Sequence, residues 1–319
     1  MTAPGRGRVV HTGQALVDLV MRVPALPEPG GDVFAPSHRF LAGGGFNAMA
    51  AAARDGAEVL YPGGHGTGPF GQIVREALEA EGISVLAPAA PDHDSGFSIA
   101  LVDDSAERTF VSTRGAETHP DPRMLQRAAP RPGDVVCVSG YSMVHARNRD
   151  ALLSWLPRLD VGVTVVVDPG PVIGNIDDEA LDALWTRADV WTTNSREARI
   201  LAKRWGNVTS LEDAPHDRLA QSLARRSRRA LVLRNGAQGS LLTQPDGHVR
   251  TFPAPRVEAV DTNGAGDAHT GVLAACLAAG RDLDTALVRA GAAAAIAVTR
   301  EGPATAPLAA ETDALLERR

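Results

Sequence analysis

Short and almost wholly apolar segments recur along this chain, and longer segments with helical periodicity separate them. The segments VVCVSG (135–140) and VTVVVDPG (163–170) are nearly continuous in apolar residues and do not alternate with polar ones. Strands of this kind are covered on both faces, which is typical of a parallel sheet wrapped by helices. The sequence therefore predicts an α/β fold with a mostly parallel central sheet.

The predicted elements alternate in kind along most of the chain, as βαβ units require. Apolar segments predict strands at 8–13, 57–63, 135–140, 163–170, 189–194, 230–236 and 240–244. Helical periodicity predicts helices at about 47–55, 72–81, 149–156, 178–187, 197–205, 217–226 and 268–279, and a last one from about 285.

Two segments interrupt this alternation. Residues 29–43 and 96–116 alternate polar with apolar residues and lack helical periodicity, which is typical of a small antiparallel sheet with one exposed face. The stretch DDSAER (103–108) lies between two predicted strands and is typical of a hairpin turn. We therefore expect one domain over residues 1–319, with a β-sheet lid formed by insertions at about 14–42 and 96–116.

Lys203 is the only lysine among the 32 basic residues, so the other 31 are arginines. Arg204 follows it and no glycine-rich loop precedes it, which excludes a G-x-x-x-x-G-K-[ST] phosphate loop. No V-A-I-K strand is present, which excludes a protein-kinase fold. The charged neighbourhood of Lys203 offers no apolar pocket for a Schiff-base lysine, and we expect this residue on the surface. Any phosphate chemistry in this protein must proceed without the usual lysine.

The charge balance and the cysteines indicate the compartment and the class of partner. A net charge of −6 and a pI of about 5.9 give no reason to expect nucleic acid or an anionic membrane. No run reaches the roughly 20 apolar residues of a membrane helix, and residues 1–8 lack the apolar core of a signal peptide. Cys137 and Cys276 are expected as buried free thiols in a reducing compartment. We expect a soluble, cytoplasmic protein.

The segment DTNGAGD (261–267) directly precedes an apolar, helix-forming stretch. Gly264, Ala265 and Gly266 have little or no side chain, so backbone N–H groups at the helix start can bind an anion there. The same N–H groups would keep the carboxylate of Asp267 ionised and able to accept a proton from a hydroxyl. A bare G-x-G-D before a helix is more often a simple cap. The neighbouring residues 261–262 and the motifs below favour a catalytic Asp267.

The segment NSRE (194–197) follows a predicted strand and begins a helix. Taken alone it is a capping box, in which Asn194 and Glu197 satisfy backbone N–H groups. Ligands in α/β folds bind at the carboxyl ends of parallel strands, and an Asn with a Glu at such a place can hold water around Mg²⁺. Both interpretations stay open from the sequence alone.

A further glycine-rich segment, LAGGGFN (41–47), is a candidate for binding a polyol. Gly43 and Gly44 allow a substrate to lie against the backbone, and Asn47 can donate to and accept from hydroxyls. Asp18 can accept hydrogen bonds from vicinal hydroxyls. The alternative for the glycine segment is a tight turn between a strand and a helix. The alternative for Asp18 is an exposed aspartate in a turn. GTGPFG (66–71) matches a dinucleotide motif, but it follows a later strand and its proline lacks a needed N–H, which disfavours that function.

In their order and spacing these motifs resemble those of the ribokinase-like sugar kinases, also called pfkB carbohydrate kinases. The resemblance spans nearly the whole chain and rests on GGGFN (43–47), GHGTGPFG (64–71), NSRE (194–197), RNGAQG (234–239) and DTNGAGD (261–267). It implies a Rossmann-like αβα sandwich with a small β-sheet lid that often mediates homodimers. It also implies transfer of the γ-phosphate of ATP, with Mg²⁺, to a primary hydroxyl of a small sugar such as ribose.

The resemblance implies a role for each candidate residue. Asp267 would be the catalytic base, and Gly264, Ala265 and Gly266 would form the anion hole for the transferring phosphoryl group. Asn194 and Glu197 would organise Mg²⁺ and phosphate. Nucleotide-binding residues would include Asn194, Arg234, Gly236 and Gly239, and the sugar would contact Asp18, Gly43, Gly44 and Asn47. Asp261 and Asn263 fall where some members bind a monovalent cation such as K⁺.

The chain departs from the family pattern at a few positions, among them His269, where Phe is common, and Arg234-Asn235, where Thr-Leu is common. These departures leave the reaction intact and the identity of sugar and nucleotide open. A nucleoside kinase is the alternative within the family, because DTNGAGD also occurs in adenosine-kinase-like members. A catalytically silent sensor of ATP or sugar is the alternative outside enzymes, and the intact Asp267 and glycine turn argue against it.

Overall fold

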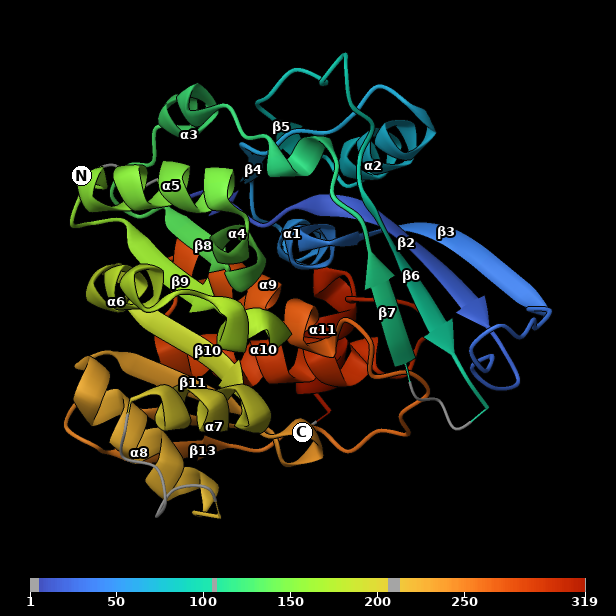
Figure 1. Cartoon of the computed structure of the whole chain (residues 1–319). Coiled ribbons are helices and arrows are strands. Elements are labelled where there is room, and N and C mark those ends of the chain that lie inside the picture. Colours follow the sequence, from blue (N-terminus) through green and yellow to red (C-terminus); the bar gives the residue numbers. More distant parts are fainter. Residues whose placement is uncertain (1–5, 105–107, 206–212, 319) are drawn as a thin grey trace.

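The computed structural model describes residues 6–104, 108–205 and 213–318. Its centre is a nine-stranded sheet, and a four-stranded sheet projects from one side of the body (Figure 1). The central strands lie in the order β13 (Val249–Phe252), β12 (Ser240–Thr243), β11 (Ala230–Arg234), β10 (Val190–Asn194), β9 (Thr164–Asp168), β8 (Val135–Ser139), β1 (Val9–His11), β4 (Val59–Tyr61) and β5 (Ser84–Val85). Neighbours from β11 to β5 are parallel, and β12 pairs antiparallel with both β11 and the edge strand β13. The mostly parallel sheet predicted from the apolar runs is confirmed.

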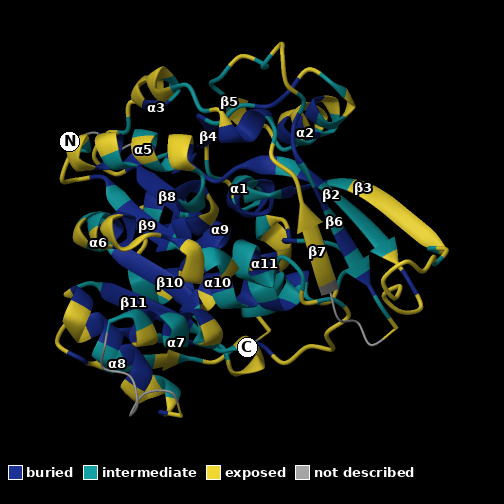
Figure 2. Cartoon of the chain, viewed as in Figure 1, coloured by how far each residue is buried: buried dark blue, intermediate teal, exposed yellow. Residues whose placement is uncertain are grey.

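Helices cover both faces of this sheet and enclose two cores, which Figure 2 shows as buried residues on either side of the strands. Alternate residues of a strand point to opposite faces, so Val166 of β9 belongs to one core and Val165 and Val167 belong to the other. The first core includes α1 (Gly45–Arg54), α2 (Pro69–Ala80), α9 (Ala265–Ala278) and α10 (Leu283–Ala297). The second includes α3 (Pro122–Ala128), α4 (Gly140–Val144), α5 (Ala146–Trp155), α6 (Asp178–Arg187), α7 (Ser195–Arg204) and α8 (His216–Ser227).

The remaining helical elements are short. Helix α11 (Ala309–Leu316) packs on α10. The 3₁₀ helices are η1 (Ala116–Thr118), η2 (Leu156–Arg158), η3 (Pro171–Asn175) and η4 (Gly236–Gln238). In the part of the chain that the structure describes, every helix is too short or too polar to cross a membrane.

The second sheet has the order β3 (Ser37–Gly44), β2 (Ala15–Arg22), β6 (Phe97–Val102) and β7 (Arg108–Ser112). The antiparallel sheet expected from the alternating residues is wrong for one pair, because β2 and β6 run parallel. The chain between them contains β3, α1, β4, α2 and β5, and a connection of that length allows a strand to return in the same direction. The predicted hairpin turn at 103–108 falls partly on residues 105–107, outside the described residues.

Three neighbouring strands of the central sheet end in polar residues that point to one face. Asp168, Asn194 and Arg234 are the last residues of β9, β10 and β11. Two residues before Asp168 and Arg234 lie Val166 and Val232, which belong to the core shared with α9. Because side chains alternate along a strand, these three strand ends point toward the side of the sheet that α9 covers.

Candidate active site

The glycine turn lies directly at the start of α9. Gly264 caps the helix with a φ of 72°, and a Cβ on it would lie 1.8 Å from the carbonyl oxygen of Pro303, so the turn needs glycine here. Ala265, Gly266 and Asp267 are the first three residues of the helix. The first N–H groups of a helix have no partner within it and carry the positive end of its dipole. This geometry suits the binding of an anion beside Asp267.

Asp267 and Asp18 are two carboxylates that lie near one another. Asn47 Nδ2 donates a hydrogen bond to Asp267 Oδ2 at 3.0 Å, which joins α1 to α9. Burial raises the pKa of Asp267 to about 6, and the hydrogen bond from Asn47 acts in the opposite direction. Burial, followed by the charge of Asp267, raises the pKa of Asp18 to about 7. Both carboxylates therefore titrate close to neutral pH.

The other sugar-binding candidates lie around Asp18. A Cβ on Gly43 would lie 1.9 Å from Asp18 Oδ2, so a side chain at Gly43 would displace this carboxylate. Gly44 is the residue before α1, with a φ of 63°. Asn47 Oδ1 is buried without a hydrogen-bond partner among the described residues, and it is free to accept one from a bound hydroxyl. The structure thus brings Asp18, Gly43, Gly44 and Asn47 together beside Asp267.

Arg234 turns inward, and its guanidinium lies among acidic groups. Its Nη1 donates to Asp168 Oδ2 at 2.6 Å, to Thr270 Oγ1 at 2.9 Å and to the Gly266 carbonyl at 3.3 Å. Its Nη2 lies 3.3 Å from Asp168 Oδ1 and 3.4 Å from Glu197 Oε2. Burial lowers the pKa of this guanidinium, but the charges of Asp168 and Glu197 and the hydrogen bond to Asp168 raise it, and the net direction is upward. Arg234 is therefore a permanent buried cation.

Asn194 and Glu197 form the capping box that the sequence left open as an alternative. Asn194 Oδ1 accepts from the Glu197 N–H at 2.9 Å, and Glu197 Oε2 accepts from the Asn194 N–H at 2.8 Å. Asn194 Nδ2 also donates to Glu197 Oε1 at 2.8 Å. Burial raises the pKa of Glu197, and the nearby charge of Arg234 opposes that rise. The pair holds the start of α7 in place at the end of β10.

The charges around this cleft fit a divalent cation. The carboxylates of Asp168, Glu197 and Asp267 lie near one guanidinium, that of Arg234, and a fourth carboxylate, that of Asp18, lies near Asp267. A nucleotide phosphate would meet an excess of negative charge there, and a cation would relieve it. Mg²⁺ binds through one or two carboxylates together with waters and substrate phosphates, and these oxygen donors fit it. Across residues 6–104, 108–205 and 213–318, no three His, Cys, Asp or Glu side chains are grouped to hold a metal by themselves.

The remaining candidates lie in loops. Asp261 Oδ1 accepts from the Asn263 N–H at 2.8 Å, and Asp261 Oδ2 accepts from the Gly302 N–H at 3.1 Å, so this carboxylate joins the loop before α9 to the loop after α10. Gly236 and Gly239 have positive φ values of 54° and 93° on the loop after β11. That loop is exposed at Gly236.

Asp168 and Thr270 belong to this cluster, although the sequence reasoning did not single them out. Asp168 ends an apolar strand as Asn194 does, so the rule that ligands bind at strand ends would have found it. Thr270 has no such signal, because only the rotation of α9 brings it to Arg234. Tyr141 lies near the same carboxylates: burial, followed by the charges of Asp267, Asp18 and Glu197, raises the pKa of its hydroxyl.

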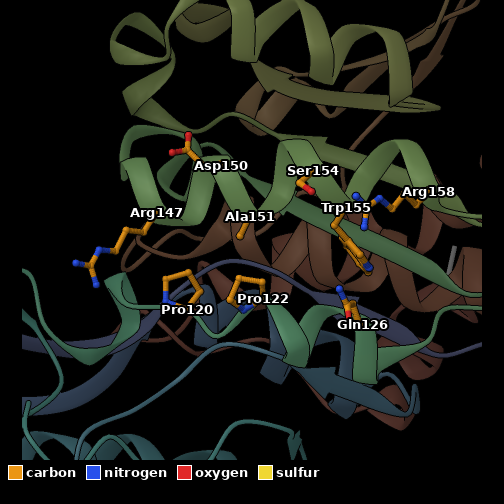
Figure 3. Close-up of a pocket in the computed structure, with 9 residues that line it drawn as sticks. All are labelled: Pro120, Pro122, Gln126, Arg147, Asp150, Ala151, Ser154, Trp155 and Arg158. Carbon is orange, nitrogen blue, oxygen red and sulfur yellow. The ribbon is translucent and has the colours of Figure 1, made fainter.

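A pocket of about 470 Å³ lies elsewhere, between α3 and α5 (Figure 3). None of the candidate residues lines it, and its two arginines are Arg147, near the start of α5, and Arg158, in η2 directly after α5. Its lining consists of Pro120, Pro122, Gln126, Arg147, Asp150, Ala151, Ser154, Trp155 and Arg158. The candidate active site is defined by its polar side chains and not by this pocket.

Comparison with known proteins gives matches over almost the entire chain. The profile of the pfkB family of carbohydrate kinases matches residues 6–310. The uncharacterized sugar kinase YegV of Escherichia coli strain K12 is 31% identical over 308 residues, which cover 95% of this chain and 92% of that protein. The ATP-dependent ribose-1-phosphate kinase of Halopiger xanaduensis is 32% identical over 318 residues, which cover 98% of this chain and 99% of that protein.

Solved structures give the same fold. The crystal structure of ribokinase from Thermotoga maritima matches with a TM-score of 0.81 at 22% identity, over 97% of this chain and 99% of that one. At that level of identity the likeness shows the fold alone. The expected α/β sandwich, with a large, mostly parallel sheet and a smaller β-sheet, is confirmed.

Proposed function

The chain belongs to the pfkB family of carbohydrate kinases, and from that premise we propose that it transfers the γ-phosphoryl group of ATP to a primary hydroxyl of a ribose-like sugar. The observation that carries the proposal is the meeting of three features in one cleft: the carboxylate of Asp267, the glycine turn at the start of α9, and Asn47 with its free Oδ1. A hydroxyl that binds Asn47 would lie next to both a base and an anion-binding turn.

Asp267 is the proposed base. A general base works best when its pKa lies near the working pH. Burial raises the pKa of the Asp267 carboxyl to about 6. The hydrogen bond from Asn47 orients one carboxylate oxygen and leaves the other to accept the proton of the acceptor hydroxyl. Phosphoryl transfer requires mostly positioning and charge stabilisation from the protein. Gly264, Ala265 and Gly266 would stabilise the transferring group through the N–H groups of the helix start.

The cations are proposed from the donor atoms present. Asn194 and Glu197 would hold Mg²⁺ through water, near the phosphates that Arg234 and the loop with Gly236 and Gly239 approach. The ion would neutralise negative charge on the phosphates during transfer. Asp261 and Asn263 would hold a monovalent cation such as K⁺ in the loop that precedes the glycine turn.

We also propose that the second sheet is a lid and that two copies of the chain pair through its outer face. On the inner face, Asp18, Ser98 and Ser112 lie in register, and the two serine hydroxyls are 2.9 Å apart. On the outer face, the row of Leu19, Phe40, Ile99 and Val111 is apolar. Phe40 is 45% exposed and Val111 is 59% exposed, and Figure 2 shows β3 and β7 as exposed strands.

The dimer is tested by measuring the mass of the protein in solution by light scattering. An apolar patch of this kind is usually covered by a partner, so the wild type is expected to be a dimer and Val111→Glu to shift it toward the monomer. A wild-type monomer at micromolar concentration would contradict the proposal.

Closure of the lid would exclude water from the active site and suppress ATP hydrolysis.

The catalytic proposal is tested by measuring ADP release with ATP, Mg²⁺ and a panel of acceptors. The panel includes ribose, other pentoses, hexoses, sugar acids, nucleosides and ribose 1-phosphate, the last because a relative is named for it. We expect the highest kcat/KM with a ribose-like sugar, and phosphorus NMR of the product should place the phosphate on a primary hydroxyl. A preference for nucleosides would favour the nucleoside kinase, and binding of ATP and sugar without ADP release would favour the silent sensor.

A further inference from the structure

The side chain of Arg234 connects four elements of the cleft. It starts at the end of β11 and reaches Asp168 at the end of β9, Glu197 at the start of α7, and α9 at two points. Its side chain is 12% exposed, so these contacts lie in the interior. A single buried guanidinium therefore ties the strand ends to the helix that carries the glycine turn and Asp267.

Thr270 completes a closed ring of hydrogen bonds. Its hydroxyl donates to Asp168 Oδ2 at 2.7 Å and accepts from Arg234 Nη1 at 2.9 Å, while Nη1 itself donates to the same Asp168 oxygen at 2.6 Å. Each member of such a ring restricts the rotamers of the other two. The ring is therefore a rigid unit and not a pair of flexible side chains that meet by chance.

The two contacts on α9 determine how the helix start is placed. Gly266 and Thr270 are four residues apart, so they lie one above the other on the same side of the helix. Arg234 Nη1 contacts the carbonyl of Gly266 and the hydroxyl of Thr270. Both contacts meet at this one nitrogen, so they anchor the first turns of α9 at a single point beside the end of β11. A Cβ on Gly266 would lie 3.4 Å from Nη1, which is an ordinary van der Waals contact, so the guanidinium packs directly beside this residue.

Stability alone does not explain such a unit. A buried ion pair is weak evidence for stability, because the loss of solvation offsets most of the attraction, and apolar residues of similar size often do as well. Accurate placement of reacting groups is different, because a displacement of about 1 Å can reduce turnover on the order of 100-fold. The position of the ring, directly against Gly266, points to placement.

We propose that Asp168, Arg234 and Thr270 form a positioning bridge that holds the glycine turn and Asp267 in register for phosphoryl transfer, with Arg234 as the fixed positive charge beside the transferring group. The bridge rests on the proposed function, because it acts on the step that Asp267 and the turn perform. In a chain whose only lysine lies on α7, a buried arginine supplies this charge.

The first test is a double-mutant cycle on turnover. Arg234→Gln, Asp168→Asn and Thr270→Val each break the ring with little change in volume, and each is expected to lower kcat on the order of 10- to 100-fold. The KM for the sugar should change little, because none of the three contacts Asp18 or Asn47. Residues that act as a unit are not additive, so Asp168→Asn combined with Arg234→Gln should lose about as much as the worse single variant. Losses that multiply, or an effect on KM alone, would overturn the bridge.

A second test separates placement from folding. Guanidinium ion is added to Arg234→Ala at concentrations far below those that denature proteins, and sodium chloride at equal ionic strength serves as the reference. We expect guanidinium to restore part of kcat in Arg234→Ala and to leave Thr270→Val unchanged. Hydrogen exchange gives a readout independent of activity: amides at the start of α9 should exchange faster in Asp168→Asn, with the rest of the protein unchanged. Equal responses to guanidinium in both variants, or unchanged exchange at α9, would contradict the proposal.

The chain offers matched control variants. Arg204 and Asp178 form an ion pair whose aspartate is 87% exposed, and Arg204→Gln and Asp178→Asn should leave kcat unchanged. Thr186→Val removes another helical threonine hydroxyl, which bonds only to a carbonyl of its own helix, and it should be equally silent. A wild type that phosphorylates no acceptor would refute the proposed function. An active wild type whose three bridge variants behave like these controls would refute the bridge alone.

Discussion

Two groups of carboxylates in the candidate active site have different hydrogen-bond donors. On the side of Asp168 and Glu197, the guanidinium of Arg234 contacts both carboxylates and opposes the rise in pKa that burial causes in Glu197. On the side of Asp18 and Asp267, an amide, Asn47, is the hydrogen-bond donor, and the two carboxyls have pKa values raised to about 7 and about 6.

This difference shows how one site can combine ion-paired groups of fixed position with a group that accepts a proton. Ionised groups that are paired and hydrogen-bonded keep their charge and position, which suits the handling of phosphates. A carboxyl whose pKa lies near neutrality can take up and release a proton, which suits a base. The carboxylates beside Arg234 are held in place by its guanidinium, whereas Asp267 has the raised pKa that suits a base.

The largest expected effect comes from Asp267→Asn, which removes the base. Turnover should fall by about 10²- to 10⁴-fold, while ATP binding, measured by calorimetry, stays close to that of the wild type. The amide can still accept the hydrogen bond from Asn47, so the local geometry is retained. Turnover near the wild-type rate would show that another group accepts the proton.

The same variant should also be more stable at neutral pH. The pKa of Asp267 is raised from an ordinary value of 3.8 to about 6, so the folded protein binds this proton more tightly than the unfolded chain does. Stability from this group is therefore present at low pH and is lost as the pH rises through about 6. The asparagine side chain cannot ionise, so Asp267→Asn avoids the loss of stability that ionisation causes in the wild type. Its thermal unfolding at pH 7.5 should therefore occur at a higher temperature than that of the wild type. A lower unfolding temperature would mean that the ionised carboxylate stabilises the fold.

Asp18→Asn tests the acceptor side without removing the base. A hydrogen bond to a charged group contributes roughly 1.5–3 kcal/mol, so the KM for the sugar should rise by about 10- to 100-fold. The KM for ATP should stay unchanged, because Asp18 lies on the second sheet and not at the strand ends. Initial rates at varied sugar and ATP check both statements, and an equal rise in the two KM values would count against a sugar-side role.

The pH profile tests the contrast between the two sides directly. Only ionised Asp267 can accept a proton, so kcat/KM should fall by about tenfold per pH unit below about pH 6. The positive charge of Arg234 lowers the pKa of Asp267. Arg234→Gln should therefore move this acidic limb to higher pH, whereas the control Arg204→Gln should leave it in place. A limb that does not move would show that the two sides are electrically independent.

The smallest effect is expected for the lone lysine. Lys203 is exposed on α7, six residues after Glu197, and belongs to neither side of the cleft. Lys203→Ala should leave turnover within about twofold, as for an ordinary surface substitution. A severe loss in the ADP-release assay would show that a lysine handles phosphate here after all.

The sequence predicts most of the candidate site because the signals for its strands and turns extend over only a few residues. The apolar runs predict the strands, and the three glycine-rich or polar segments that follow them lie where such strands end or helices begin. It found Asp267 and Asn47 separately, but the bond between them joins residues 220 positions apart. It placed Arg234 on the nucleotide loop, and the inward turn of its side chain has no local signal.

The amino-acid sequence by itself determined the alternation of strand and helix, the places where polar residues end strands, and the turn at 264–266, because periodicity, strand polarity and glycine φ angles act over a few residues. Tertiary structure decided that β2 and β6 run parallel, and that Arg234 meets Asp168 and Thr270 across 66 and 36 residues of chain. Those contacts depend on how far apart packed elements lie and how each helix is rotated, and these distances and rotations exist only once the two cores have formed.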